Sequence, residues 1–220
     1  MQPTMDRARF NMIEQQVRPW DVLNERVLTV MRNLPREAFV PDAYRGLAYA
    51  DIEIPLGERT AMLAPKLVGR MLQALDVRPH ESVFEIGTGT GYVTACLAHL
   101  GERVSSIEID PDLAEGARAR LDAMGPSRVE VHTIDAFAGH IQGWPFDVIA
   151  VTGSVPTTEP LAALERLLAD AGRLFIVVGE PPLMEAMLIT RIGNDFRRER
   201  LFETNIASLE NAPTPERFAF

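Results

Sequence analysis

A closely spaced run of glycines constrains the fold of this chain more than any other feature. Gly87, Gly89 and Gly91 stand at alternate positions directly after a short apolar run, Ser82–Phe84, and the two residues Glu85 and Ile86. The stretch that follows, 92–98, has the character of a helix. Glycines let a backbone turn sharply from a strand into a helix and let a ligand approach main-chain atoms closely. The run therefore predicts a strand–loop–helix unit with a ligand site at its turn.

Acidic residues stand at the ends of three predicted strands. Glu85 lies two residues before the first glycine, Glu108 ends the apolar run 103–107, and Asp135 follows the run 129–134. Glu108 comes about 20 residues after the loop, the distance at which a nucleotide-binding βαβ unit places an acid on the ribose hydroxyls. Ligands of open parallel sheets bind outside the carboxyl ends of the strands, so we expect these carboxylates to face one ligand.

The chemistry of these side chains favours S-adenosylmethionine as the cofactor, with NAD as the alternative. S-adenosylmethionine offers an ammonium group, ribose hydroxyls, an adenine amine and a sulfonium to such carboxylates. A dinucleotide would bring a pyrophosphate, which an ionised Glu85 at the mouth of the loop would repel. The predicted cofactor-binding residues are Glu85, Gly87, Thr88, Gly89, Gly91, Glu108, Ile109, Asp135 and Ala136.

Strand and helix patterns alternate from residue 82 onward. Strands are expected near 82–86, 103–108, 128–134, 146–151 and 173–178, and helices near 91–100, 111–123 and 159–169. This alternation is typical of a doubly wound parallel α/β sheet. Two further extended segments, 186–192 and 198–204, flank the turn-forming residues 193–195 and predict an antiparallel hairpin at the sheet edge. The expected fold is a mostly parallel, seven-stranded, Rossmann-like sheet.

The N-terminal third of the chain has a different pattern, which predicts a helical elaboration of the same domain. Helices are expected over residues 6–17, over 22–34 and from Pro65 onward, the first with an apolar stripe of Phe10, Ile13 and Val17. No linker separates this part from the sheet. We therefore expect a single domain over 1–220, with 1–78 as the N-terminal, substrate-side elaboration and 79–220 as the cofactor-binding sheet and hairpin.

Composition and charge exclude several classes of protein. The 220 residues are 46% hydrophobic and 24% charged, as in a soluble globular protein, and the net charge of -9 argues against nonspecific binding to nucleic acid. No apolar run approaches the roughly 20 residues of a membrane span, and no signal peptide is evident. One cysteine, Cys96, fits a core thiol in the reducing cytoplasm. The four histidines, His80, His99, His132 and His140, lack the spacing of metal ligands.

Five segments along the chain match patterns known from one enzyme family. Pro35–Pro41 resembles its PRExFVP segment, 48–57 resembles the stretch before its substrate loop, Phe84–Tyr92 resembles its LEIGTGSGY cofactor loop, and 146–149 and 171–174 resemble two strand signatures. The chain is thus similar to the protein-L-isoaspartate O-methyltransferases over nearly its whole length. The resemblance implies a methyltransferase that uses S-adenosylmethionine to methylate the carboxylate of L-isoaspartyl residues in damaged protein.

Two positions depart from that family, and both lie in the expected site. Leu63 stands where the substrate loop usually has a serine, and Ala136 replaces a glycine after Asp135. A leucine cannot donate a hydrogen bond, which predicts weak isoaspartyl activity and a gain on Leu63→Ser, unless Leu63 is a core residue that anchors the loop. Thr60 and Ser154 are the nearest hydroxyls that could replace the serine. The candidate catalytic residues are Thr60, Leu63, Thr152 and Ser154.

Carboxyl methylation needs no general base. A carboxylate is already ionised at neutral pH, with a pKa of about 4, and the sulfonium methyl is already activated. Placement of the reacting atoms in line and removal of water would supply the catalysis. Two alternatives stay open: a divergent methyltransferase that acts on another, small acceptor, and a non-catalytic protein that binds S-adenosylmethionine. The sequence does not indicate an oligomeric state.

Overall fold

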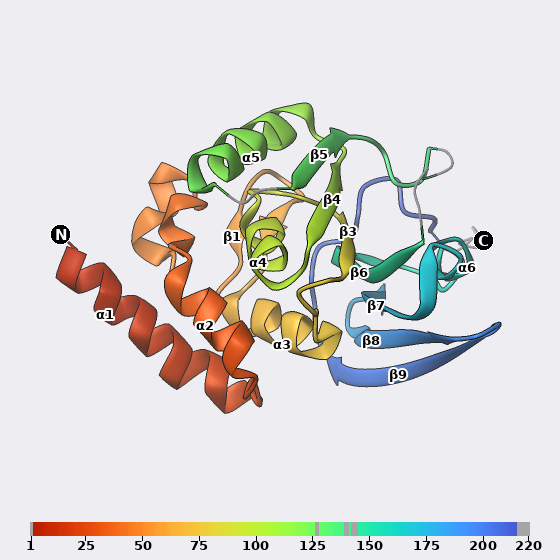
Figure 1. The fold of residues 1–220 in the computed structure, drawn as a ribbon. Helices are drawn as coiled ribbons and strands as arrows, with labels where there is room; N and C mark the ends of the chain where they lie inside the picture. Colours follow the sequence, from red (N-terminus) through yellow and green to blue (C-terminus); the bar gives the residue numbers. More distant parts are fainter. Residues whose placement is uncertain (1, 126–127, 139–140, 142–144, 215–220) are drawn as a thin grey trace.

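The computed structural model describes residues 2–125, 128–138, 141 and 145–214. Figure 1 shows a central sheet with helices packed around it and an N-terminal group of helices at one side. His140, which the sequence analysis considered, lies outside the described residues.

The sheet has seven strands in the described part of the chain, in the order β5-β4-β3-β6-β7-β8-β9. These are β3 (Ser82–Ile86), β4 (Arg103–Glu108), β5 (Val129–Thr133), β6 (Phe146–Val155), β7 (Leu168–Glu180), β8 (Leu183–Ile192) and β9 (Asp195–Glu203). The pairs from β5 to β7 are parallel, and β8 pairs antiparallel with both β7 and β9. The predicted parallel sheet with an antiparallel hairpin at its edge is confirmed. Its direction of winding reverses between β3 and β6, where open sheets bind ligands.

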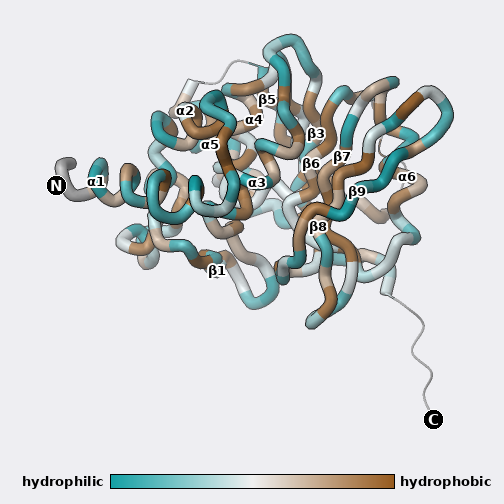
Figure 2. The backbone as a smooth tube through the Cα atoms, turned by 90° about the horizontal axis from the view of Figure 1, so that it is seen from below, coloured by the Kyte–Doolittle hydropathy of each residue, from teal (hydrophilic) through white to brown (hydrophobic). Residues whose placement is uncertain are grey.

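Apolar side chains cover both faces of this sheet because successive strand residues point to opposite sides. Val83 belongs to the larger core, under α3 (Pro65–Leu75), α4 (Tyr92–Leu100) and α5 (Pro111–Met124). Its neighbour Phe84 belongs to the core on the other face, under α6 (Leu161–Glu165), and stacks on Phe146 with 4.9 Å between the ring centroids. Figure 2 shows the hydrophobic colouring of the central strands β6 and β7.

Two strands and one helix differ in length from their predicted bounds. β6 continues to Val155 and β7 begins at Leu168, whereas α6 spans only Leu161–Glu165. Residues 168 and 169 were expected to be helical, but Leu168 pairs with Phe146 of β6 instead. Ser154 and Val155 likewise pair with β7, which extends the fourth strand beyond its predicted end. Sheet pairing overrides the local preference in both places.

The N-terminal helices form a layer beside α3. They are α1 (Gln2–Met12), the π-helical turn η1 (Ile13–Val17), the 3-10 turn η2 (Arg18–Trp20), α2 (Glu25–Asn33), and the 3-10 turns η3 (Arg36–Ala38) and η4 (Asp42–Leu47). The predicted stripe was wrong for Phe10, which is 57% exposed, whereas Ile13 and Val17 are buried. Phe10 lies in the regular helix α1, whose core-facing side is formed by Met5, Ala8 and Met12 instead. The single domain over 1–220, with 1–78 as its N-terminal part, stays a prediction; one core cluster includes buried residues of both parts, from Met12 to Ile206.

A short hairpin connects this layer to α3. It consists of β1 (Ile54–Pro55) and β2 (Ala61–Met62), which pair antiparallel. The Thr60 carbonyl accepts hydrogen bonds from the amides of Leu56 (2.8 Å) and Gly57 (3.2 Å), which close its turn. The hairpin and its flanks, residues 53–63, are called the 53–63 loop below.

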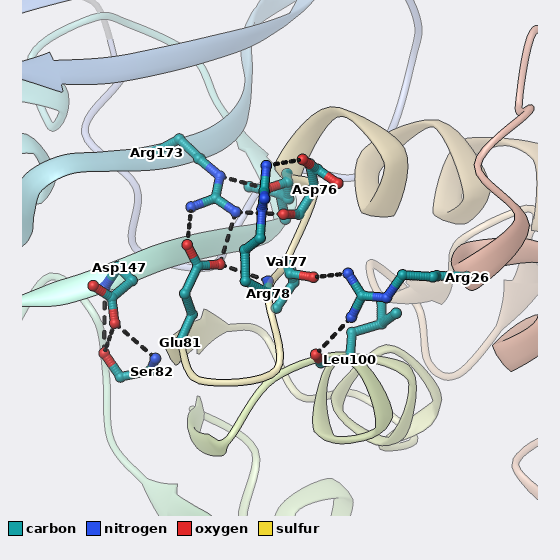
Figure 3. Close-up of polar contacts among 10 residues, drawn as sticks. Arg26, Asp76, Val77, Arg78, Glu81, Ser82, Leu100, Asp147 and Arg173 are labelled. Carbon is teal, nitrogen blue, oxygen red and sulfur yellow. Dashed lines mark hydrogen bonds and ion pairs between the residues drawn. The ribbon is translucent and has the colours of Figure 1, made fainter.

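A polar network ties the amino-terminal edge of the sheet to the helices (Figure 3). Arg173 of β7 donates to both carboxylate oxygens of Glu81, at 2.7 and 2.8 Å, and also to the carbonyls of Leu75 and Asp76 at the end of α3. Arg26 of α2 donates to the carbonyls of Val77 and Leu100. This network lies at the edge opposite the glycine loop.

Candidate active site

A cleft of about 1050 Å³ lies at the carboxyl-terminal edge of the sheet. It is bordered by the glycine loop after β3, the ends of β4, β6 and β7, the 53–63 loop, and the segment 205–212 that follows β9. A small hollow adjoins it and reaches Asp135 and Ala136. The two spaces share Gly87, Glu108, Ile109, Leu209 and Glu210, so they are parts of one site.

The three glycines of the loop all have left-handed backbone conformations but differ in what surrounds them. A Cβ at Gly87 (φ +93°) would collide with the Thr152 hydroxyl, and one at Gly91 (φ +88°) would lie 3.3 Å from the Ala117 Cβ of α5. At Gly89 (φ +54°) the nearest atom would be the Leu56 Cδ1, 3.6 Å away, and the residue borders the cleft. Gly87 and Gly91 are therefore required by packing, whereas Gly89 leaves room for a ligand.

Glu108 is held rigidly at the end of β4. Its Oε2 accepts from the Gly89 amide at 2.7 Å, and its Oε1 accepts from the amides of Ile109 (3.0 Å) and Asp110 (3.1 Å). A carboxylate has about four acceptor positions, so these three bonds leave capacity for a ligand hydroxyl. Glu108 and Ile109 border both parts of the site, and their role in binding the cofactor stays a prediction.

Glu85 lies behind the glycine loop and outside the lining of both spaces. Its Oε2 accepts from the hydroxyls of Thr94 (2.5 Å) and Ser106 (2.6 Å), and its buried Oε1 has no partner among the described residues. Burial raises the pKa of Glu85 to about 8, although the Ser106 and Thr94 hydroxyls lower it, and Glu108 adds to the rise. A carboxyl that is mostly neutral at pH 7 cannot repel a pyrophosphate strongly, so the charge argument against NAD does not rest on Glu85.

Thr88 and Gly91 also lie outside the lining of the two spaces. The Thr88 hydroxyl is 2.6 Å from the Ser106 hydroxyl, and Gly91 packs on α5. Thr88, Ser106, Thr94 and Glu85 thus form one buried chain of hydrogen bonds beneath the loop. A role for Glu85, Thr88 and Gly91 in binding the cofactor stays a prediction, which this chain of bonds would serve by fixing the loop.

The segment 205–212 forms a wall of the site that sequence reasoning missed. It runs beside the end of β6, where the Ser154 amide donates to Ala207 (2.9 Å) and the Leu209 amide donates to Ser154 (2.8 Å). The Asn211 side chain donates to Asp135 Oδ2 at 2.8 Å, while the Phe137 amide donates to Oδ1. Asn211 is 76 residues from Asp135, so no local pattern could indicate this contact.

All four candidate catalytic residues border the cleft, but their side chains differ in what they contact. Thr152 donates to the carbonyls of Ile86 and Gly87, and the buried Ser154 donates to that of Ile206 (3.3 Å). The exposed Thr60 has no side-chain hydrogen bond to another described residue. Leu63 is only 6% exposed and belongs to the larger core. Thr60 is thus the free hydroxyl of the set, and the burial of Leu63 favours the anchoring role.

The charged residues around the cleft are mostly acidic. Arg59 is accompanied by Glu53, Glu108, Asp110, Glu180 and Glu210. Burial raises the pKa of Glu53. Such a lining suits a cofactor that carries a positive sulfonium.

The described residues include no group of three His, Cys, Asp or Glu side chains placed to hold a metal ion. Among them there is also no helix of the length and apolar character that crossing a membrane requires.

The fold and the site define a Rossmann-like, S-adenosylmethionine-dependent methyltransferase. A family model described as "Protein-L-isoaspartate(D-aspartate) O-methyltransferase (PCMT)" matches residues 8–205. The chain belongs to this family, which confirms the predicted family, the class of enzyme and the cofactor.

Relatives and solved structures agree with this assignment. The protein-L-isoaspartate O-methyltransferase of Koribacter versatilis (strain Ellin345) is 39% identical over 93% of this chain and 90% of its own length. That of Methylorubrum extorquens (strain PA1) is 40% identical over 91% and 88%. A putative protein-L-isoaspartate O-methyltransferase from Plasmodium falciparum, solved with S-adenosyl-L-homocysteine, has a TM-score of 0.77 at 19% identity, covering 94% of this chain and 98% of its own. At that identity the solved structure supports the fold alone.

Proposed function

We propose that this methyltransferase acts on the carboxylate of L-isoaspartyl residues in damaged proteins. The observation that carries the proposal is the placement of the 53–63 loop across the same cleft as the glycine loop and Glu108. That loop brings the cation Arg59 and the free hydroxyl of Thr60 into the lining of this cleft. A carboxylate acceptor would find in Arg59 an opposite charge within an otherwise acidic lining.

The residues of the chain would bind and orient rather than move protons. When bound, S-adenosylmethionine supplies an activated methyl group. Glu108 would accept from the ribose hydroxyls, and Asp135 with Ala136 would border the adenine in the small hollow. The absent side chain of Gly89 leaves space along the loop, which is the feature of this structure that fits the cofactor. An acceptor carboxylate is already ionised, so orientation and removal of water are what the site must supply.

Thr60 is the residue on which acceptor binding is expected to depend. We expect Thr60→Val to lower kcat/KM for an isoaspartyl peptide by about 1–2 kcal/mol in free energy, the scale of one neutral hydrogen bond. Thr60→Ser, which keeps the hydroxyl, is the matched control and should stay near the wild type. Equal activities of Thr60→Val and Thr60→Ser would exclude a role for this hydroxyl.

Leu63→Ser separates the two roles considered for Leu63. Because Leu63 is buried in the core, we expect this variant to lose about 2–4 kcal/mol of stability without gaining activity. Chemical denaturation and peptide turnover, measured on the same preparation, distinguish this from a missing substrate contact. A gain in turnover would show instead that position 63 faces the acceptor and that the wild type lacks a useful hydroxyl there.

The overall proposal is tested by methyl transfer to an isoaspartyl peptide, with the normal aspartyl peptide as the matched substrate. We expect turnover of the first and none of the second. Binding of S-adenosylhomocysteine without transfer to either peptide would contradict the proposal and support a divergent acceptor or a binding-only protein.

We further propose that the enzyme is cytoplasmic. Its single cysteine, the buried Cys96, supports this because it suits a reducing compartment.

A further inference from the structure

Arg36 carries a positive charge in the middle of the protein core. Its side chain is 0% exposed, and no carboxylate in the described part of the chain forms an ion pair with it. Its Nε donates to the Ala48 carbonyl at 2.8 Å and its Nη2 to the Leu63 carbonyl at 2.7 Å. The guanidinium lies over the ring of Tyr92, 4.9 Å from the centroid.

A buried charge of this kind is costly for the stability of the fold. Its desolvation is unfavourable, its Nη1 has no partner among the described residues, and an apolar side chain of similar size would avoid both costs. What a leucine or methionine could not supply is the rigid fork of donors on a flat, stackable group. The useful property of Arg36 is therefore the set of groups that it holds together.

Those groups come from the end of the 53–63 loop, from the turn before that loop and from the start of α4. The Leu63 carbonyl belongs to the last residue of the 53–63 loop, which borders the cleft on the proposed acceptor side. Tyr92 is the first residue of α4 and directly follows Gly91 of the glycine loop. Ala48 follows η4, the turn before the 53–63 loop. One guanidinium thus fixes the loop at its end and rests on the residue that follows the cofactor loop.

We propose that Arg36 is a positioning residue that holds the 53–63 loop against the glycine loop, and so sets where the acceptor lies relative to the methyl group. The effect on turnover rests on the proposed function, whereas the effect on the loop does not. Arg36→Lys tests it, because a lysine keeps the charge but cannot bond both carbonyls in the same geometry.

We expect three results for Arg36→Lys. The KM for an isoaspartyl peptide should rise about tenfold or more, because the acceptor is no longer placed. The Kd for S-adenosylhomocysteine should stay within about twofold of the wild type. Trypsin should cut after the exposed Arg59 about tenfold faster, because the loop opens more often. The cleavage measurement does not depend on enzyme activity. If the wild type were inactive on the peptide, the proposed function would fail, and the cleavage rates would still decide the proposal about the loop.

Arg26→Lys is the matched control. Arg26 also donates to two main-chain carbonyls, those of Val77 and Leu100, but at the opposite edge of the sheet (Figure 3). It should leave KM and cleavage after Arg59 within about twofold of the wild type. Arg36→Met, which removes the charge, should raise both quantities as Arg36→Lys does, even where thermal stability is kept.

The proposal is overturned if Arg36→Lys and Arg36→Met lower only the melting temperature, with KM and cleavage as in the wild type. Failure of both variants to fold would also overturn it, because Arg36 would then serve the fold rather than the loop. Equal rates of cleavage after Arg59 in Arg26→Lys and Arg36→Lys would also overturn the proposal, because the loss of any main-chain contact would then have the same effect.

Discussion

At the scale of single residues, the three glycines of the loop are needed for different physical reasons, although they share one sequence pattern. A side chain at Gly87 would collide with Thr152, and one at Gly91 would press tightly against α5. Gly89 has space, and that space borders the cleft. Of the three glycines, only Gly89 should therefore be a position where a substitution weakens cofactor binding more than it lowers the stability of the fold.

We expect Gly89→Val to weaken binding of S-adenosylhomocysteine by more than about 3 kcal/mol, while the left-handed backbone costs about 1–2 kcal/mol of stability. Gly125→Val is the matched control, because Gly125 also has a positive φ (+73°) and open space but lies outside the cleft. It should share the loss of stability and keep the affinity. Calorimetric titration of both variants decides, and an unchanged affinity in Gly89→Val would mean that the loop is only a turn.

A second prediction at this scale concerns Glu85 and pH. Its pKa in the folded protein is about 8, mainly through burial, against 4.5 as the ordinary value. The folded protein therefore keeps a proton that the unfolded chain releases in this interval. The resulting stabilisation is complete below about pH 4.5 and is lost as the pH rises toward 8, by up to about 1.4 kcal/mol per pH unit.

Glu85→Gln should remove that slope, since the amide stays neutral. Melting temperatures of both proteins between pH 5 and 8 provide the measurement. The wild type should lose stability with rising pH relative to the variant. Parallel curves would show that Glu85 is ionised throughout and that its burial is offset in another way.

At the scale of elements, the clamp around Arg173 joins β7, the end of α3 and the start of β3 (Figure 3). Burial alone would raise the pKa of Glu81, but its hydrogen bonds from Arg173 and Arg78 lower it overall. The side chains of Arg173 and Glu81 are only 14% and 12% exposed. Removal of one partner leaves the other charge poorly solvated.

We expect Arg173→Met to cost about 3 kcal/mol of stability, the scale for breaking a buried pair, without changing cofactor affinity. Arg78→Met removes an exposed pair with Asp76 and serves as the control, with an expected loss below about 1 kcal/mol. Urea denaturation provides both numbers. A similar small loss in the two variants would mean that water replaces the clamp at little cost.

At the scale of the whole molecule, the site exists only when distant segments come together. Residues from the 53–63 loop, from four strand ends and from 205–212 surround one cleft. A ligand that binds this cleft binds the folded state alone and should stabilise it by mass action. Stability is therefore a test of the cofactor that does not depend on the acceptor.

S-adenosylhomocysteine at about one hundred times its Kd should add about 2.7 kcal/mol and raise the melting temperature by roughly 5–10 °C. NAD at the same concentration is the control and should produce no shift. A shift with NAD, and none with S-adenosylhomocysteine, would contradict the cofactor assignment.

The sequence by itself determined the parallel sheet, the hairpin at its edge and the cofactor loop, because each depends on a local pattern of apolar residues, glycines and strand-end acids. Tertiary structure decided the rest. The burial of Leu63, the distance of Glu85 from the cleft and the bond between Asn211 and Asp135 all arise from packing between segments far apart in the chain. Sequence spacing specifies which residues share an element, but only the packing of elements decides which of them reach the same ligand.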